Sequence, residues 1–109
     1  MSILNRFSKN LTAIKYPKEK STWNIGGIIK GQNAFYKFDV REMFILPDGK
    51  PAQSTNTKNK ADKLVLEGEK EWLIIDFKEL KNYVKKNKVT KVYVDDLIAS
   101  LEWTIILKK

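Results

Sequence analysis

A run of alternating side chains between Phe35 and Ile45 constrains the fold of this chain more than any other feature. One parity is mainly apolar and the other mainly charged, with Tyr36, Phe38, Val40, Glu42 and Phe44 set against Lys37, Asp39, Arg41, Met43 and Ile45. Successive side chains of a strand point to opposite faces, so this pattern predicts a strand with one buried and one charged face. Pro47-Asp48-Gly49 predicts the turn that follows, because Pro presets φ and Gly accepts positive φ.

The length and charge of the chain narrow both its fold and its function. Its 109 residues suit one domain, and 42% hydrophobic residues are enough to form a core. The chain carries 21 Lys+Arg against 13 Asp+Glu, a net charge of +8. Such an excess has two interpretations: it keeps a protein in solution, or it attracts a polyanion such as nucleic acid.

The residue types present do not indicate catalysis. The chain has no cysteine and no histidine, which removes thiolate chemistry, the commonest general base and the commonest metal ligand. Its carboxylates show no metal-ligand spacing, and Asp76-Phe77-Lys78 resembles a nuclease motif only faintly. The sequence therefore predicts a protein that is not an enzyme, with no catalytic residues, no metal and no cofactor.

The apolar runs, such as Trp72–Ile75 and Thr104–Leu107, are too short to span a bilayer. Arg6 and Lys9 interrupt the first apolar residues, so a signal peptide is not indicated either. We expect no membrane partner and a cytoplasmic location, which is the host cytoplasm if the protein is viral.

The pattern divides the chain into three segments. Residues 1–21 form an amphipathic arm, in which apolar residues recur at helical spacing: Ile3, Leu4, Phe7, Leu11 and Ile14. This arm is either an ordinary helix packed on the body or a movable arm over a binding surface. Residues 22–88 form the core, with strands followed by a helix. Residues 89–109 form an apolar C-terminal extension.

Strand signals in the core lie over 22–30, 35–45, 64–66 and 71–75. Gly26-Gly27 indicates a bulge or a close approach of backbone, and Gly31-Gln32-Asn33 a hairpin turn. Residues 51–63 contain no large apolar side chain, which favours a loop or a solvated strand end.

The clearest helix signal follows Asp76, which is expected to be the N-cap. Glu79 lies three residues on, as in a capping box, and lysines fill the last turn. The expected buried stripe is Phe77, Leu80, Tyr83 and Val84.

The C-terminal extension predicts a short helix from Asp95-Asp96 and a final strand over 103–107. One helix cannot cover both faces of a four-stranded sheet. A tail this apolar would also form an exposed apolar patch on the surface of a monomer, which favours association. We therefore expect a homodimer in which the helix and the tail pack against their two-fold mates.

Basic side chains interleave with aromatic ones on the predicted strands and loops. Single-stranded nucleic acid is typically held this way, with cations along the phosphates and bases stacked on exposed rings at roughly 1–3 kcal/mol per base. The candidate nucleic-acid-binding residues are Lys30, Phe35, Lys37, Arg41, Phe44, Lys50, Lys58, Lys60 and Lys63. Trp23 and Tyr36 share the pattern, whereas core packing is the expected role of Phe38, Trp72, Phe77 and Trp103.

Three short motifs occur in an order that resembles the positive cofactor four family of transcriptional coactivators. Asp39-Val40-Arg41-Glu42-Met43-Phe44 followed by Pro47-Asp48-Gly49 resembles the family signature D-I-R-E-aromatic-W and P-E-G. Trp23-Asn24-Ile25-Gly26 is similar to the opening F-x-I-G, and Ile75-Asp76-Phe77-Lys78-Glu79-Leu80 to the entry into the helix. The resemblance covers residues 22–88.

The resemblance implies an α+β fold: a four-stranded antiparallel curved sheet followed by a helix, dimerising through the helix. It also implies a sequence-nonspecific single-stranded DNA-binding homodimer, either a transcription cofactor or a phage homologue in DNA replication or recombination. Replication or transcription proteins would then be further partners. By motif, Arg41 would contact phosphate and Phe44 would replace a stacking tryptophan.

The chain also departs from the family pattern. Gly27, Ile28 and Ile29 stand where the family has a basic pair, and the basic cluster after the turn is stretched over 50–63. Arg41 and Phe44 differ in parity, so both can reach one ligand only across a bulge or strong twist.

Two other functions fit the same charge pattern. The first is a small basic protein-interaction module that engages a host protein through its N-terminal arm. The second is an RNA-associated β-domain, since nothing in the sequence distinguishes ribose from deoxyribose.

Overall fold

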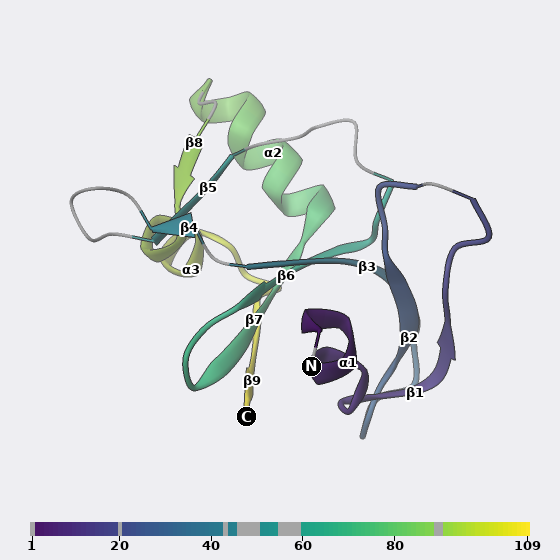
Figure 1. The fold of residues 1–109 in the computed structure, drawn as a ribbon. Helices are drawn as coiled ribbons and strands as arrows, with labels where there is room; N and C mark the ends of the chain where they lie inside the picture. Colours follow the sequence, from purple (N-terminus) through teal and green to yellow (C-terminus); the bar gives the residue numbers. More distant parts are fainter. Residues whose placement is uncertain (1, 20, 43, 46–50, 55–59, 89–90) are drawn as a thin grey trace.

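The computed structural model describes residues 2–19, 21–42, 44–45, 51–54, 60–88 and 91–109, with backbone alone at 44–45, 51–54 and 91. Helices and strands follow one another from the N-terminus to the C-terminus as drawn in Figure 1. They are α1 (Ile3–Ser8), β1 (Leu11–Lys15), β2 (Ile25–Ile29), β3 (Phe35–Glu42), β4 (Phe44–Ile45), β5 (Pro51–Ser54), β6 (Lys63–Glu67), β7 (Glu71–Asp76), α2 (Phe77–Asn87), β8 (Lys91–Tyr93), α3 (Val94–Ser100) and β9 (Ile105–Lys108). The fold is α+β, as predicted.

The main sheet has six strands in the order β1-β2-β3-β6-β7-β9. Strands β3 and β6 run parallel, from the pair Phe38 and Lys63 to the pair Glu42 and Glu67. The other neighbours are antiparallel. The expected four-stranded antiparallel sheet is therefore wrong in strand number and in one pairing, and the observed sheet also differs from the one that the family resemblance implies.

The parallel pairing arises because the chain leaves the main sheet after Glu42. Phe44–Ile45 pairs with Ala52 and Pro51, and Gln53 continues the strand beside Val92, so β4, β5 and β8 make a second, three-stranded sheet. A parallel connection needs such a crossover, and residues 43–62 supply it. Of the two interpretations of residues 51–63, a loop is wrong at β5, which is a strand. The predicted turn at 47–49 lies outside the described residues.

The hairpin predicted at Gly31 is present, and the strands predicted over 64–66 and 71–75 form a second one. Strands β2 and β3 pair antiparallel around Gly31, whose φ of 89° requires glycine. Strands β6 and β7 pair in unbroken register. The tight backbone predicted at the two glycines is confirmed, since a Cβ on Gly27 would lie 3.0 Å from the carbonyl oxygen of Thr12.

The N-terminal arm is shorter than its helical pattern predicted. Helix α1 ends at Ser8, and Leu11 begins strand β1, which pairs with β2. The helical spacing of Leu11 and Ile14 was misleading, because Leu11 is buried by the sheet and Ile14 is exposed. Phe7 has no exposed surface and meets Phe38 and Trp72 edge-on, at centroid distances of 5.3 and 5.1 Å. Helix α1 is therefore an ordinary packed helix.

Each face of the sheet has its own core, as the helices on opposite sides of β3 and β6 in Figure 1 indicate. On one face, α1 covers Phe38, Val40, Val65 and Ile74. On the other, α2 and α3 cover Leu64, Leu66, Leu73 and Ile75. The premise that one helix must leave a face to a partner chain is therefore wrong, because α1 covers the second face within the same chain.

Helix α2 begins where the sequence predicted. The Asp76 carboxylate accepts a hydrogen bond from the Glu79 amide at 3.1 Å, and Phe77, Leu80 and Val84 are buried. Glu79 does not complete a capping box: its carboxylate instead accepts bonds from the amides of Glu102 and Trp103 at 3.2–3.3 Å. This carboxylate ties the connection between α3 and β9 to α2. No helix among the described residues has the length and apolarity to cross a membrane.

The C-terminal extension forms α3 and β9, close to their predicted positions. Leu97 is fully buried in the core beneath α2. Trp103 is 67% exposed, so its expected core role is wrong: it precedes β9, in the turn held by Glu79.

An ion cluster joins both ends of the chain to strand β6. The Arg6 guanidinium donates two hydrogen bonds of 2.8 Å to the Glu67 carboxylate, and the Lys109 ammonium donates a third at 3.0 Å. The bonds from Arg6 are the main reason that the pKa of Glu67 is lowered to about 2. The cluster therefore helps to hold α1 and the end of β9 on the sheet.

We predict that Phe7→Ala lowers the free energy of unfolding by about 3–5 kcal/mol, because it leaves a cavity between Phe38 and Trp72. Urea denaturation followed by circular dichroism measures the loss. Ile14→Ala is the control, since Ile14 is exposed on β1 and its loss changes stability by at most about 0.5 kcal/mol. Equal effects of both variants would contradict the anchoring role of α1.

We predict that Glu67→Gln destabilises the protein at pH 7 by roughly 1–2 kcal/mol and flattens its stability at acid pH. A pKa that falls from 4.5 to about 2 on folding gives stability that is complete above pH 5. That stability is lost as the pH falls toward 2. Denaturation midpoints between pH 2 and 7 should thus converge for the variant and the parent at low pH. The exposed Glu71→Gln variant should follow the parent throughout.

Candidate nucleic-acid interface

Two aromatic rings lie over a glycine on the face of the sheet opposite α1. In the β2–β3 hairpin, Gly26 pairs with Lys37 and Ile28 pairs with Phe35. A Cβ on Gly26 would lie 2.8 Å from Cζ of Phe35 and 3.3 Å from Cζ3 of Trp23. Glycine at this position lets both rings rest on the strand. Phe35 remains 41% exposed, and the partly buried Trp23 also packs on the core beneath α2.

Three lysines surround these rings. The Lys15 ammonium lies 5.9 Å from the centroid of Phe35, and the Lys37 ammonium lies 5.7 Å from that of Trp23. Lys60 is exposed and lines a hollow of about 430 Å³ together with Trp23 and Lys18. We call Lys15, Trp23, Phe35, Lys37 and Lys60 the basic-aromatic surface.

Short hydrogen bonds to backbone hold this surface in place. The Asn24 side chain accepts from the Val40 amide at 2.9 Å and donates to the Val40 carbonyl at 3.0 Å, which fixes the residue beside Trp23. The Lys60 amide donates to the Thr22 hydroxyl at 2.7 Å. The Asp62 carboxylate accepts from the Lys37 amide at 2.9 Å, so it extends the parallel β3–β6 pairing ahead of its first residue pair, Phe38 and Lys63.

The basic-aromatic surface continues toward the start of α2. Lys60 also lines a second hollow of about 550 Å³, whose wall includes Tyr36 and two lysines of α2, Lys78 and Lys81. The carboxylates at this hollow, Asp62 and Asp76, accept hydrogen bonds from backbone amides. The two adjacent hollows thus share Lys60, and in each the lysines outnumber the carboxylates by one, with Glu19 counted in the first.

The structure brings together only part of the set predicted from the sequence. Phe35, Lys37 and Lys60 lie on the basic-aromatic surface, and Lys30 is exposed just after β2. Lys50, Lys58 and the side chain of Phe44 lie outside the described part of the chain. Phe44 belongs to the second sheet, so the prediction that it shares one strand with Arg41 is wrong.

Two predicted residues have partners within the chain instead. The Arg41 guanidinium donates to the Asp39 carboxylate, with Nε at 3.0 Å, and Asp39 is buried. Lys63 is only 8% exposed: its ammonium lies 3.1 Å from Asp76 and 4.8 Å from the ring centroid of Tyr36. A paired cation gains little from a phosphate, so we leave both residues out of the interface.

Lys15 is the residue that the sequence did not indicate. It stands in the segment whose spacing predicted a helix, but β1 pairs with β2 and places Lys15 opposite Gly26. The β-branched Thr12 and Ile14 beside it were the available signal for a strand.

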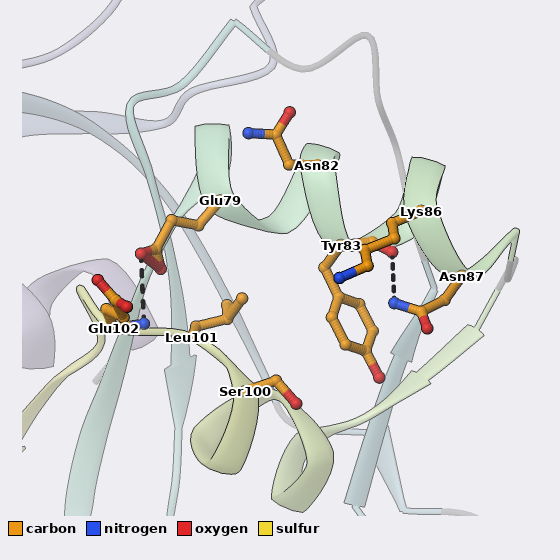
Figure 2. Close-up of a pocket in the computed structure, with 8 residues that line it drawn as sticks. All are labelled: Glu79, Asn82, Tyr83, Lys86, Asn87, Ser100, Leu101 and Glu102. Atoms are coloured by element: carbon orange, nitrogen blue, oxygen red, sulfur yellow. Dashed lines mark hydrogen bonds between the residues drawn. The ribbon is translucent and has the colours of Figure 1, made fainter.

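A third hollow, of about 450 Å³, lies between α2 and the end of α3 (Figure 2). The side chains that line it in Figure 2 carry mostly amide, hydroxyl and carboxylate groups. The Glu79 carboxylate among them accepts a hydrogen bond from the Glu102 amide. Two carboxylates, Glu79 and Glu102, outnumber the single lysine, Lys86, among its lining residues, so this hollow is less suited to phosphate than the basic-aromatic surface.

Comparisons with protein-family models, with curated proteins and with solved structures find no match to this chain.

Proposed function

We propose that the protein binds single-stranded DNA without sequence preference, through the basic-aromatic surface. The observation that carries this proposal is the pair of rings over Gly26 with an ammonium group within 6 Å of each ring. The exposed ring of Phe35 offers stacking to an unpaired base, and the lysines offer contacts to the phosphates on either side. The net charge of +8 favours the same partner through counterion release.

The surface favours single strands over duplex for a steric reason. In a duplex the faces of the bases are stacked on one another and cannot reach Phe35, whereas a single strand can turn its bases outward. The family resemblance points to the same substrate, but the six-stranded mixed sheet differs from the sheet of that family, so the proposal rests on the surface. The expected ligand is the single-stranded DNA that is exposed during replication, recombination or transcription.

We also propose that the protein acts as a homodimer, formed by the C-terminal extension and without α2. The outer positions of α2 are mostly lysine and asparagine, whereas Trp103 and Ile106 in the extension are 67% and 49% exposed. Exposed apolar groups of this size gain free energy when a partner covers them.

We predict that Phe35→Ala weakens binding of a labelled oligo-dT by about 5- to 150-fold, which corresponds to one lost stacking contact. Fluorescence anisotropy at two salt concentrations measures the affinity, with a duplex and an RNA of the same length as competitors. Tyr93→Ala is the matched control, because Tyr93 is a ring of similar exposure that lies on β8, in the second sheet. Equal affinity for strand and duplex, or an unaffected Phe35→Ala variant, would contradict the proposal.

We predict that Lys37→Ala lowers the salt dependence of oligo-dT binding, with a slope of log K against log salt that is smaller by about 0.7. The variant removes one ammonium beside Trp23, while its backbone bonds to Asp62 remain. Lys70→Ala, in the exposed β6–β7 turn, is the control and should keep the parental slope. Identical slopes for parent and Lys37→Ala would exclude Lys37 as a phosphate contact.

A further inference from the structure

The two edge strands of the main sheet, β1 and β9, differ in how regularly they pair with their neighbours. The β1–β2 register shifts between Thr12 and Lys15, and Ala13 there has a positive φ of 53°. Such an irregularity bends an edge and protects it from pairing with another chain. At the other end, β9 pairs with β7 through four consecutive residues with no shift. The edge formed by β9 is therefore the regular one.

The backbone of β9 presents hydrogen-bonding groups along this edge. The Lys109 amide donates to the Lys70 carbonyl at 3.1 Å, so the polar groups of residue 109 point toward β7. In an antiparallel ladder these directions alternate along the strand. The amide and carbonyl groups of Ile106 and Lys108 consequently point away from the sheet, and the Ile106 side chain beside them is 49% exposed.

The charges around β9 fit a second copy of the same strand. Glu102 and Trp103 precede the strand, and Lys108 and Lys109 end it. When two copies pair antiparallel about a two-fold axis, the start of one strand lies opposite the end of the other. The Glu102 carboxylate then lies near the Lys108 ammonium group of the mate, while Lys109 keeps its bond to Glu67 of its own chain. Lysines on an edge ordinarily discourage pairing, but here each copy also brings the acid that offsets them.

We propose that β9 pairs antiparallel with β9 of a second copy, about a two-fold axis close to Ile106, and so joins two main sheets into one. Main-chain hydrogen bonds from Ile106 and Lys108 form the contact, with the two Ile106 side chains at its centre. This inference names the contact surface of the proposed homodimer and is independent of the nucleic-acid partner.

The experiment measures molar mass by light scattering after size exclusion, over a concentration series, for the full chain. Ile106→Lys places two extra cations face to face at the axis and should raise the dimer dissociation constant by at least about tenfold. Ile98→Lys is the matched control, because Ile98 is 40% exposed on α3 and should leave the dimer unchanged. Thermal melts of both variants confirm that they remain folded.

A charge exchange tests the orientation of the two strands. Glu102→Lys and Lys108→Glu should each weaken the dimer, and the double exchange should restore it. A parental chain that stays monomeric at all concentrations overturns both the homodimer and this contact. A dimer that survives Ile106→Lys overturns this contact and leaves a homodimer through another surface. Oligo-dT anisotropy with the same variants reports separately on the nucleic-acid proposal.

Discussion

The parallel pairing of β3 with β6 is the interaction on which the rest of the structure depends. Among the described strands of the main sheet, it is the one pairing that joins β1–β3 to β6, β7 and β9. A parallel pair is stable when both its faces are covered. Here α1 packs over Val40 and Val65 on one side, while α2 packs over Leu64 and Leu66 on the other. The short N-terminal helix is thus as necessary to the sheet as the longer α2.

The same junction positions the basic-aromatic surface. Asp62 precedes β6 and bonds to both backbone groups of Lys37, donating to its carbonyl at 2.8 Å and accepting from its amide at 2.9 Å. Lys60, two residues earlier, is fixed to Thr22 beside Trp23. The hydrogen bonds between Asp62 and Lys37, which extend the pairing of β3 with β6, therefore also fix the position of Lys37 relative to the ring of Trp23.

The sequence predicted what depends on local periodicity and capping. Phe38 and Val40 are buried as expected, although Asp39 between them is buried too, Gly31 makes its turn, and Asp76 caps α2. It did not predict what depends on pairing between distant segments. Alternation over Phe35–Ile45 cannot reveal that the chain changes sheets between Glu42 and Phe44, because both sheets use the same period. Helical spacing of Leu11 and Ile14 likewise cannot exclude a strand that pairs with β2.

The candidate site was predictable to the same degree. Phe35, Lys37 and Lys60 could be named from charge and aromatic content, since their exposure follows from their own strands and loops. Lys63 and Arg41 could not be excluded, because their carboxylate partners became visible only with the β6–β7 register and the burial of Asp39. Lys15 was missed because its place opposite Gly26 is a property of the β1–β2 pairing. Composition thus indicated a surface of lysines and aromatic rings, whereas the pairing of the strands determines which residues belong to it.

The two proposals have a joint geometric consequence. A two-fold axis perpendicular to the sheet keeps each face on its own side, so both basic-aromatic surfaces would lie on the same face of the joined sheet, turned by its twist. Between β3 and its mate lie β6, β7, β9 and their three counterparts, which at about 4.8 Å per step separates the surfaces by roughly 34 Å along the sheet. A short oligonucleotide would occupy one surface, whereas a longer strand could bind both and gain affinity from the link alone. Dimerisation at β9 would therefore act on nucleic-acid affinity through strand length, without any residue of β9 touching the strand.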